Sequence, residues 1–254
     1  MDIAITRQVS RSIVNCELTF MSREPVDVAR AQRQHAQYEA TLKSLGLAVL
    51  SLPEEPDLPD SVFVEDTALV LDECAVIALP GAASRQPEVE SIRDVLAPFR
   101  QLLHIRAPGT LDGGDILRIG SRLYVGLSQR SNIAAVTQMR DLLAPHGFDV
   151  STVPVHGCLH LKSAVTEISP NVLLVNPAWV NTEAFGGVTI IEIDPSEPHA
   201  ANALRCGDLV VCSAAFPRTG ARLEQAGLRT IAVEADELAK AEGGLTCCSL
   251  IFRI

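Results

Sequence analysis

The feature that most constrains the fold of this chain is a loose internal repeat of about 35 to 45 residues. Each copy reads strand, turn, strand, helix, strand. In the clearest copy, which begins at Glu65, the pattern predicts a hairpin over 67–80, a helix over 87–99 and a returning strand over 102–108. Each copy therefore predicts one small α/β unit.

Three further copies follow along the chain, and a fifth is divided between its two ends. The second copy starts at Gly113 and ends at 155, and the fourth begins near Asn202 and ends at 235. The third lies over 163–194 and has only a short helix around 182–185. Residues 248–254 and 5–53 together supply the fifth copy. A ring closed by pairing the C-terminal strand with the N-terminal strands leaves no exposed sheet edge. The sequence predicts a single domain over residues 1–254, a closed α/β propeller of five ββαβ-type repeats around a central axis; the alternative is a plain α/β sandwich.

The residues that start the first strand of each unit should converge on the central axis of such a ring, and they are rich in reactive groups. They are Glu65, Asp66, Asp112, Asp115, His160, Ser163, Asn202, Cys247 and Cys248. A thiol, an imidazole and several carboxylates from separate units are therefore predicted to lie together. Cys248 is expected to face the other way on an extended strand and to pack in the core.

A cysteine, a histidine and a carboxylate form the arrangement of an activated thiolate, in which the histidine acts as general acid and base. Cys247 follows two glycines, which let the backbone approach a ligand closely. The alternatives are an inert buried thiol, a core histidine and, least favoured, a structural zinc site, because no Cys or His pair has the usual ligand spacing.

Carboxylates around a thiolate make an anionic site, which favours a cationic substrate. A planar guanidinium suits Glu65 and Asp66, because paired carboxylates hold it through bidentate hydrogen bonds; the alternative is a solvated hairpin start. Arg85 and Arg130 follow the second strands of two successive units and could capture a carboxylate. A substrate with a guanidinium at one end and a carboxylate at the other is an arginine.

Charge and apolar patterning exclude several classes of partner. The chain has 31 acidic and 21 basic residues, a net charge of −10, and no basic stripe of the kind that binds nucleic acid. Its apolar runs, such as 172–175, are far shorter than the roughly 18 residues of a membrane span. The first residues lack a secretory signal pattern, and seven cysteines without a C-x-x-C pair favour reduced thiols. We expect a cytoplasmic protein that binds neither nucleic acid nor membrane.

Eight short blocks, in an order and spacing that span nearly the whole chain, carry a family resemblance. The blocks are VDVARAQRQH (26–35), LPDSVFVEDTALV (58–70), LPGAASR (79–85), TLDGGDIL (110–117), YVGLSQRSN (124–132), STVPV (151–155), LHLKS (159–163) and GGLTCCS (243–249). The chain resembles the dimethylarginine dimethylaminohydrolases, of the guanidino-group-modifying superfamily with the pentein propeller fold. The resemblance implies hydrolysis of Nω,Nω-dimethyl-L-arginine or Nω-monomethyl-L-arginine to L-citrulline and an alkylamine.

The resemblance also implies roles for individual residues. Cys247 would attack the guanidinium carbon to give a covalent thiouronium, His160 would act as acid and then as base, and Asp112 would orient His160. The implied substrate contacts are Glu65 and Asp66 to the guanidinium, Arg85 and Arg130 to the α-carboxylate, and Asp60 with the backbone carbonyls of Leu18 and Ala241 to the α-amine. Relatives have Asp or Glu at position 112 and a larger aliphatic residue at 241. The segment 18–25 matches a loop that covers the substrate, and no metal or organic cofactor is implied.

Two other functions are weighed against this interpretation. An arginine deiminase or another small-guanidine hydrolase would release ammonia or a different amine, but deiminases of this fold carry a sizeable helical insertion, for which 254 residues leave no room. A non-catalytic pentein that only binds would lack the cysteine or the histidine, and both are present. The sequence does not set the preference among methylated and free arginine, and it leaves a homodimer open.

Overall fold

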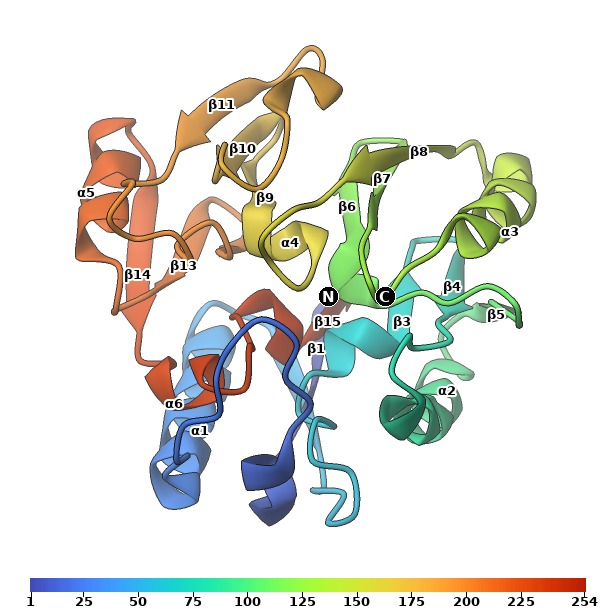
Figure 1. Cartoon of the computed structure of the whole chain (residues 1–254), viewed down its shortest axis with the longest axis horizontal. Coiled ribbons are helices and arrows are strands. Elements are labelled where there is room, and N and C mark those ends of the chain that lie inside the picture. The colour runs from blue at the N-terminus through green and yellow to red at the C-terminus, as the bar shows by residue number, and fades with distance from the viewer.

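The computed structural model describes residues 1–254 and contains five three-stranded sheets arranged around a common centre (Figure 1). In every sheet the middle strand pairs antiparallel with one neighbour and parallel with the other. A parallel pair requires a crossover connection, which lies on the outside of the ring in Figure 1. The predicted five-unit α/β propeller is confirmed, and the plain sandwich is wrong.

Four of the five units are continuous in sequence. They comprise β3 (Ala68–Val70), β4 (Cys74–Ile77), α2 (Val89–Leu96) and β5 (Gln101–His104); β6 (Ile116–Ile119), β7 (Arg122–Leu127), α3 (Ile133–Leu143) and β8 (Asp149–Pro154); β9 (Val165–Ser169), β10 (Val172–Val175) and β11 (Thr189–Glu192); and β12 (Leu204–Cys206), β13 (Leu209–Ser213), α5 (Pro217–Gln225) and β14 (Arg229–Val233). In the third of these units a 3₁₀ turn over Thr182–Ala184 replaces the crossover helix. This agrees with the short helix predicted there.

The fifth unit joins the two ends of the chain. It comprises β15 (Leu250–Arg253), β1 (Asp2–Arg7), α1 (Val28–Ser44) and β2 (Ala48–Leu52). β15 pairs antiparallel with β1, with Ile5 opposite Leu250, and β1 pairs parallel with β2. The ring is therefore closed by hydrogen bonds between the C-terminal and N-terminal strands, as predicted.

The core consists of five clusters that lie between neighbouring units, and each long helix packs against its own sheet. α3 begins after Asn132, whose side chain accepts the N–H of Ala135, a helix cap that stabilises the first turn. Its buried residues include Val136 and Met139, which pack in one cluster with Leu123 of β7. Residues spaced three and four apart form one helix face, so this apolar stripe holds the helix against its sheet. None of the helices has the length and apolar character needed to cross a bilayer.

The first strands of neighbouring units pack against one another at the centre, β15 with β3, β6 with β9, and β9 with β12. A short helical turn precedes four of these strands: Val64–Thr67, Gly113–Asp115, α4 (Leu161–Ala164) and Thr246–Cys248. Cys248 is therefore in a 3₁₀ turn, and the extended conformation predicted for it is wrong, because Leu245 and Thr246 carbonyls accept the N–H groups of Cys248 and Ser249. Cys248 is nevertheless buried in the core, as predicted.

Candidate active site

The turns that precede the central strands place the chemistry-bearing side chains together. Glu65 and Asp66 lie in one turn, Asp112 precedes the next, His160 precedes α4 and Cys247 lies in the last, and all five are buried. The turn at 64–67 packs against both the turn at 113–115 and the turn at 246–248. Glu65 and Asp66 are therefore buried, and the alternative of a solvated hairpin start is wrong.

His160 is held by a carboxylate that is itself fixed by the backbone. Nε2 of His160 lies 3.0 Å from Oδ2 of Asp112, and the N–H of Gly81 donates to Oδ1 of Asp112 at 2.8 Å. On the other side of the ring, Nδ1 lies 3.8 Å from Oδ1 of Asp66. Burial by itself would lower the pKa of His160, but Asp66 and the hydrogen bond with Asp112 outweigh it and raise the pKa to about 9. The imidazole is therefore protonated at neutral pH and can donate a proton.

Gly114 gives the imidazole its space. The N–H of Gly114 donates to Oδ1 of Asp66 at 2.9 Å. A Cβ at position 114 would lie 2.7 Å from Nδ1 of His160 and 2.7 Å from the same Asp66 oxygen. Only glycine therefore lets the backbone approach both groups closely.

Asp115 ties the loop of His160 to the loop of Arg130. Its carboxylate accepts hydrogen bonds from the hydroxyls of Ser128 and Ser131 and from the N–H of Leu161 at 2.6, 2.7 and 2.9 Å. Burial raises the pKa of Asp115 to about 6, against the opposing effect of His160. The sequence predicted that Asp115 lies at the centre but not that it organises both loops, because its partners are two hydroxyls far along the chain.

The thiol of Cys247 is buried, and its sulfur accepts the N–H of Gly244 at 3.4 Å. Burial, and then the charges of Glu65 and Asp66, raise the pKa of Cys247 well above its ordinary value. A cation placed among these groups would oppose both effects. Without one, the thiol is neutral at neutral pH.

Glu65 already has two partners. Lys162 Nζ lies 2.6 Å from Oε1, and the hydroxyl of Thr246 donates to Oε2 at 2.7 Å. Asn202 fixes Thr246 in turn, because its amide donates to the Thr246 hydroxyl and its oxygen accepts the Thr246 N–H. Neither Lys162 nor Thr246 was predicted as a site residue, although they lie in the family blocks LHLKS and GGLTCCS.

Arg85 is held by several buried acceptors. Nη1 donates to Asp66 at 2.6 Å, and Nε and Nη2 donate to Glu88. Nη2 also donates to the carbonyls of Asp60 and Phe63. A guanidinium has five N–H groups, so these contacts leave one N–H of Nη1 for a ligand. Sequence reasoning missed Glu88, whose pKa burial raises to about 7 despite the opposing charge of Arg85.

Arg130 has the open donors. Its Nη1 is buried without a hydrogen-bond partner and lies 3.9 Å from Oδ2 of Asp112. Its Nη2 donates to the hydroxyl of Thr19 at 3.1 Å. Asp60, on the same side of the site, accepts the N–H of Glu17 at 3.0 Å through one oxygen only, and burial raises the pKa of Asp60. A donor and an acceptor thus remain for a ligand here.

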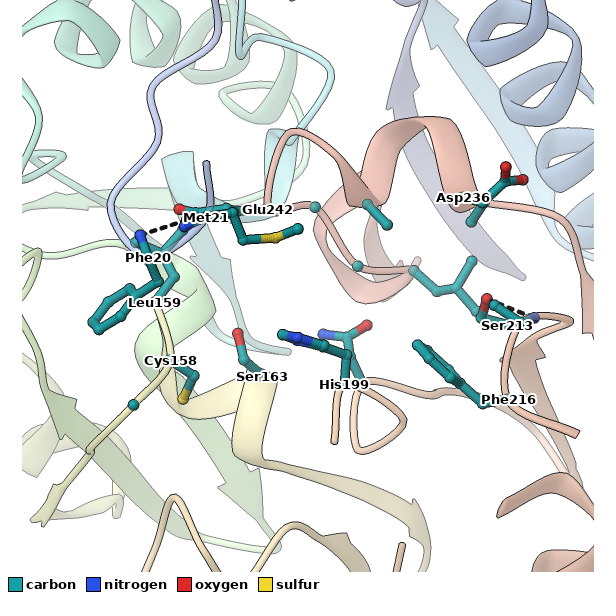
Figure 2. A pocket seen from close by; sticks show the side chains of 18 residues that line it. Phe20, Met21, Cys158, Leu159, Ser163, His199, Ser213, Phe216, Asp236 and Glu242 are labelled. Atoms are coloured by element: carbon teal, nitrogen blue, oxygen red, sulfur yellow. Dashed lines mark hydrogen bonds between the residues drawn. The ribbon is translucent and has the colours of Figure 1, made fainter. Parts of the chain in front are cut away.

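These groups surround a small cavity. Its lining includes Asp60, Asp66, Arg85, Arg130, His160, Ala241 and Cys247. Glu65, Asp112 and Leu18 are not lining residues, although Glu17, the neighbour of Leu18 in the chain, is one. A larger and mostly apolar cavity of about 280 Å³ adjoins it (Figure 2). The two cavities share Leu159, Glu242 and Gly243.

Asp66, Asp112 and His160 are also close enough to share a metal ion, with one ligand atom of each within 4.8 Å of the others. Each of them already has partners in the protein: Arg85 and Gly114 for Asp66, Gly81 for Asp112, and Asp112 for His160. A metal ion would have to compete with these contacts. The observed pairing suits proton transfer by His160.

Comparison with known proteins identifies the family. The chain is 37% identical over 250 residues to the N(G),N(G)-dimethylarginine dimethylaminohydrolase of Pseudomonas aeruginosa, with 98% of each chain covered. It belongs to the dimethylarginine dimethylaminohydrolase family. A second member, from Streptomyces coelicolor, is 35% identical over 252 residues and covers 98% of this chain and 96% of its own. No family model matches the sequence.

Solved structures agree with this assignment. A cysteine-to-serine mutant of the Pseudomonas aeruginosa dimethylarginine dimethylaminohydrolase, in complex with citrulline, superposes with a TM-score of 0.93 at 36% identity, with 98% of both chains covered. The N-terminal domain of a cyanobacterial arginine dihydrolase superposes with a TM-score of 0.87 at 18% identity over 98% of this chain and 97% of its own. At that identity the second likeness shows the fold alone.

Proposed function

We propose that this protein hydrolyses Nω,Nω-dimethyl-L-arginine and Nω-monomethyl-L-arginine to L-citrulline and dimethylamine or methylamine. One observation carries the proposal: in a chain of this family, Cys247 and the Asp112-held His160 line one buried cavity together with Asp66 and Arg130. Hydrolysis of a substrate guanidinium requires a thiol nucleophile, a protonated imidazole to supply the proton, carboxylates to bind the guanidinium and an arginine with unpaired donors to bind the α-carboxylate.

The reaction proceeds in two steps on Cys247. The bound guanidinium lowers the pKa of the thiol, whose proton is released, and the thiolate sulfur bonds to the guanidinium carbon. His160 donates its proton to the departing nitrogen as the C–N bond breaks, which leaves a covalent thiouronium and a neutral amine. Neutral His160 then takes a proton from water, and the hydroxide adds to the same carbon. The C–S bond breaks as the proton of the added hydroxyl passes to the sulfur, which gives citrulline. The cycle ends with the neutral thiol and the imidazolium restored, and the proton that the thiol released in the first step remains in solution.

The two ends of the substrate are assigned from the free hydrogen-bonding groups. The α-carboxylate binds Nη1 of Arg130, which is buried without a partner, and takes the remaining N–H of Arg85. The α-ammonium binds the open oxygen of Asp60 and the backbone carbonyls of Leu18 and Ala241. The guanidinium lies against Glu65 and Asp66, where it shares these carboxylates with Lys162 and Arg85.

Two further expectations belong to this proposal. All seven cysteines are free thiols, which supports a reducing, cytoplasmic location. The α-amino and α-carboxyl contacts all come from one chain, so the proposed site is complete in a monomer, and a homodimer stays open.

The test is citrulline release from dimethylarginine, monomethylarginine and arginine. Cys247→Ser should abolish release, whereas Cys248→Ser, which alters the adjacent buried thiol, should retain it. Release from free arginine alone would indicate a deiminase instead. No release from any of the three would overturn the proposed activity.

The ionisation of Cys247 can be tested separately. We expect iodoacetamide to alkylate Cys247 only at high pH in the empty enzyme, because burial and nearby carboxylates raise the pKa of the thiol. A bound guanidinium analogue that leaves the sulfur accessible should move this pH dependence to lower pH. An identical pH dependence with and without the analogue would contradict the role of the substrate charge.

A further inference from the structure

We propose that Glu242 is a positioning residue that aligns the two backbone carbonyls of Leu18 and Ala241 on the α-ammonium of the substrate. This inference rests on the proposed function. It gives the segment 17–23, which covers the small cavity, a defined closed position held by one carboxylate.

The carboxylate of Glu242 accepts three successive backbone N–H groups. Thr19 donates to Oε2 at 3.0 Å, and Phe20 and Met21 both donate to Oε1 at 2.6 Å. Figure 2 shows Glu242 beside Phe20 and Met21, with the contact drawn as a dashed line. These three N–H groups have no other acceptor in the structure. Hydrogen bonds to an ionised acceptor are the strong ones, so this carboxylate is the main attachment of the segment.

The position of Glu242 in the chain links the two proposed ammonium ligands. Glu242 directly follows Ala241, and its carboxylate accepts the N–H of Thr19, which directly follows Leu18. In a trans peptide the N–H and the C=O point in opposite directions. The contact therefore points the Leu18 carbonyl away from the Glu242 carboxylate. The Ala241 carbonyl belongs to the peptide bond that joins Ala241 to Glu242.

The backbone of Glu242 indicates that this side chain is kept for a reason. After α6 (Asp236–Ala239), the N–H of Gly243 donates to Leu238 and the N–H of Glu242 donates to Ala239, which is a Schellman helix end with Glu242 at its left-handed position. Its φ is 58°. Glycine usually occupies that position because a Cβ is disfavoured there. A glutamate in a conformation that favours glycine points to a function for its carboxylate.

Two of the remaining contacts of the segment involve groups assigned to the substrate, whereas Ser84 donates to Glu17 and Arg23 donates to the carbonyls of Val14 and Cys16. Asp60 accepts the N–H of Glu17, and Arg130 donates to the hydroxyl of Thr19. Glu242 lines both cavities and makes no ion pair with a basic side chain. Its negative charge therefore remains beside Asp60, at the end of the cavity where the ammonium binds. Asp60 and Arg130 can then turn to the substrate while Glu242 still holds the backbone of residues 19–21.

The experiment compares Glu242→Gln and Glu242→Gly with Glu24→Gln. Glu24 is an exposed glutamate in the same stretch of chain with no hydrogen bond through its side chain, so its variant is matched in charge and location. Glu242→Gly removes the carboxylate but suits the left-handed backbone, so the fold is retained. For dimethylarginine, kcat/KM should fall about 10- to 100-fold in both Glu242 variants, mainly through KM, because a misplacement of about 1 Å at a binding group costs this much. Glu24→Gln should match the parent.

A substrate that lacks the α-amine separates positioning from a general structural effect. With the dimethylguanidino acid that retains the carboxylate but has no amine, the Glu242 variants should lose less than about threefold in kcat/KM, because the carbonyls then have no ligand to hold. Equal losses on both substrates would overturn the proposal.

Hydrogen exchange tests the attachment without any turnover. The amides of Thr19, Phe20 and Met21 should exchange at least about tenfold faster in both Glu242 variants than in the Glu24 variant, because each has Glu242 as its acceptor. Unchanged exchange would refute the attachment. If the parent enzyme turned over no methylarginine, the proposed function would fail while this exchange measurement still decided the role of Glu242 in closing the segment.

Discussion

Replacement of Gly114 by alanine is the sharpest test of the site geometry. The added Cβ would lie 2.7 Å from Nδ1 of His160 and 2.7 Å from Oδ1 of Asp66. Ordinary van der Waals contact begins at 3.4 Å, so one or both groups must move by about 0.7 Å (3.4 minus 2.7). Both are buried and engaged, His160 with Asp112 and Asp66 with Arg85, so the movement disturbs the proton donor directly.

The expected magnitude follows from that displacement. A misplacement of this size at a catalytic group lowers kcat by about 10- to 100-fold, or about 1.4 to 2.7 kcal/mol of transition-state stabilisation. Overpacking of a buried site also costs about 1 to 3 kcal/mol of folding free energy. The assays are citrulline release at saturating dimethylarginine and unfolding in urea.

Gly220→Ala is the matched control. Gly220 lies within α5, and a Cβ there would meet nothing within 4 Å. The same chemical change should therefore leave kcat unaltered and stabilise the protein by roughly 0.5 to 1 kcal/mol, since glycine disfavours a helix interior. If Gly114→Ala kept the parental kcat and stability, the close packing of His160 against residue 114 would be refuted.

Three further predictions concern folding free energy, each measured by urea unfolding. Arg85→Met should cost about 3 to 5 kcal/mol because it leaves Asp66 and Glu88 buried without their cation; a variant as stable as the parent would contradict the ion pairs. His160 has a pKa of about 9 against an ordinary 6.5, so its stabilisation is complete below pH 6.5 and is lost as the pH rises through 9. The parent should therefore lose on the order of 3 kcal/mol more than His160→Gln over that range, and parallel curves would rule this out. Asn132→Ala should cost about 1 kcal/mol through loss of the α3 cap, and an unchanged midpoint would argue against the cap.

Much of the architecture could be predicted because the fold repeats. Each hairpin in the chain carries its own apolar pattern, and Gly120 marks the turn between β6 and β7 with a positive φ. Five weak copies of one pattern constrain the topology more than any single copy does. The conformation of Cys248 was predicted wrongly, because two adjacent thiols before an apolar run look like a strand, and only the hydrogen bonds around Leu245 and Thr246 reveal the turn.

The convergence of the site followed from the same repeats, but the partners within it did not. The order of units brings Glu65, Asp112, His160 and Cys247 to one end of the axis whatever their side-chain rotamers. Which cation pairs with which carboxylate depends on small differences in the distances between their side chains, and these distances are set by how the units pack. The pairs of Lys162 with Glu65 and of Arg85 with Asp66 are examples, because each joins residues far apart in the chain.

The closed ring of five units, the family and the residue types at its centre could be predicted from the chain, because they depend on periodicity and on the order of blocks along it. The tertiary structure alone decided which charges are already paired and which are open. Arg85 and Arg130 looked equivalent in sequence, yet Arg85 is surrounded by buried acceptors while Nη1 of Arg130 has none. The reason is physical: hydrogen bonding and burial depend on the separation of groups in space, and residues far apart in the chain set that separation.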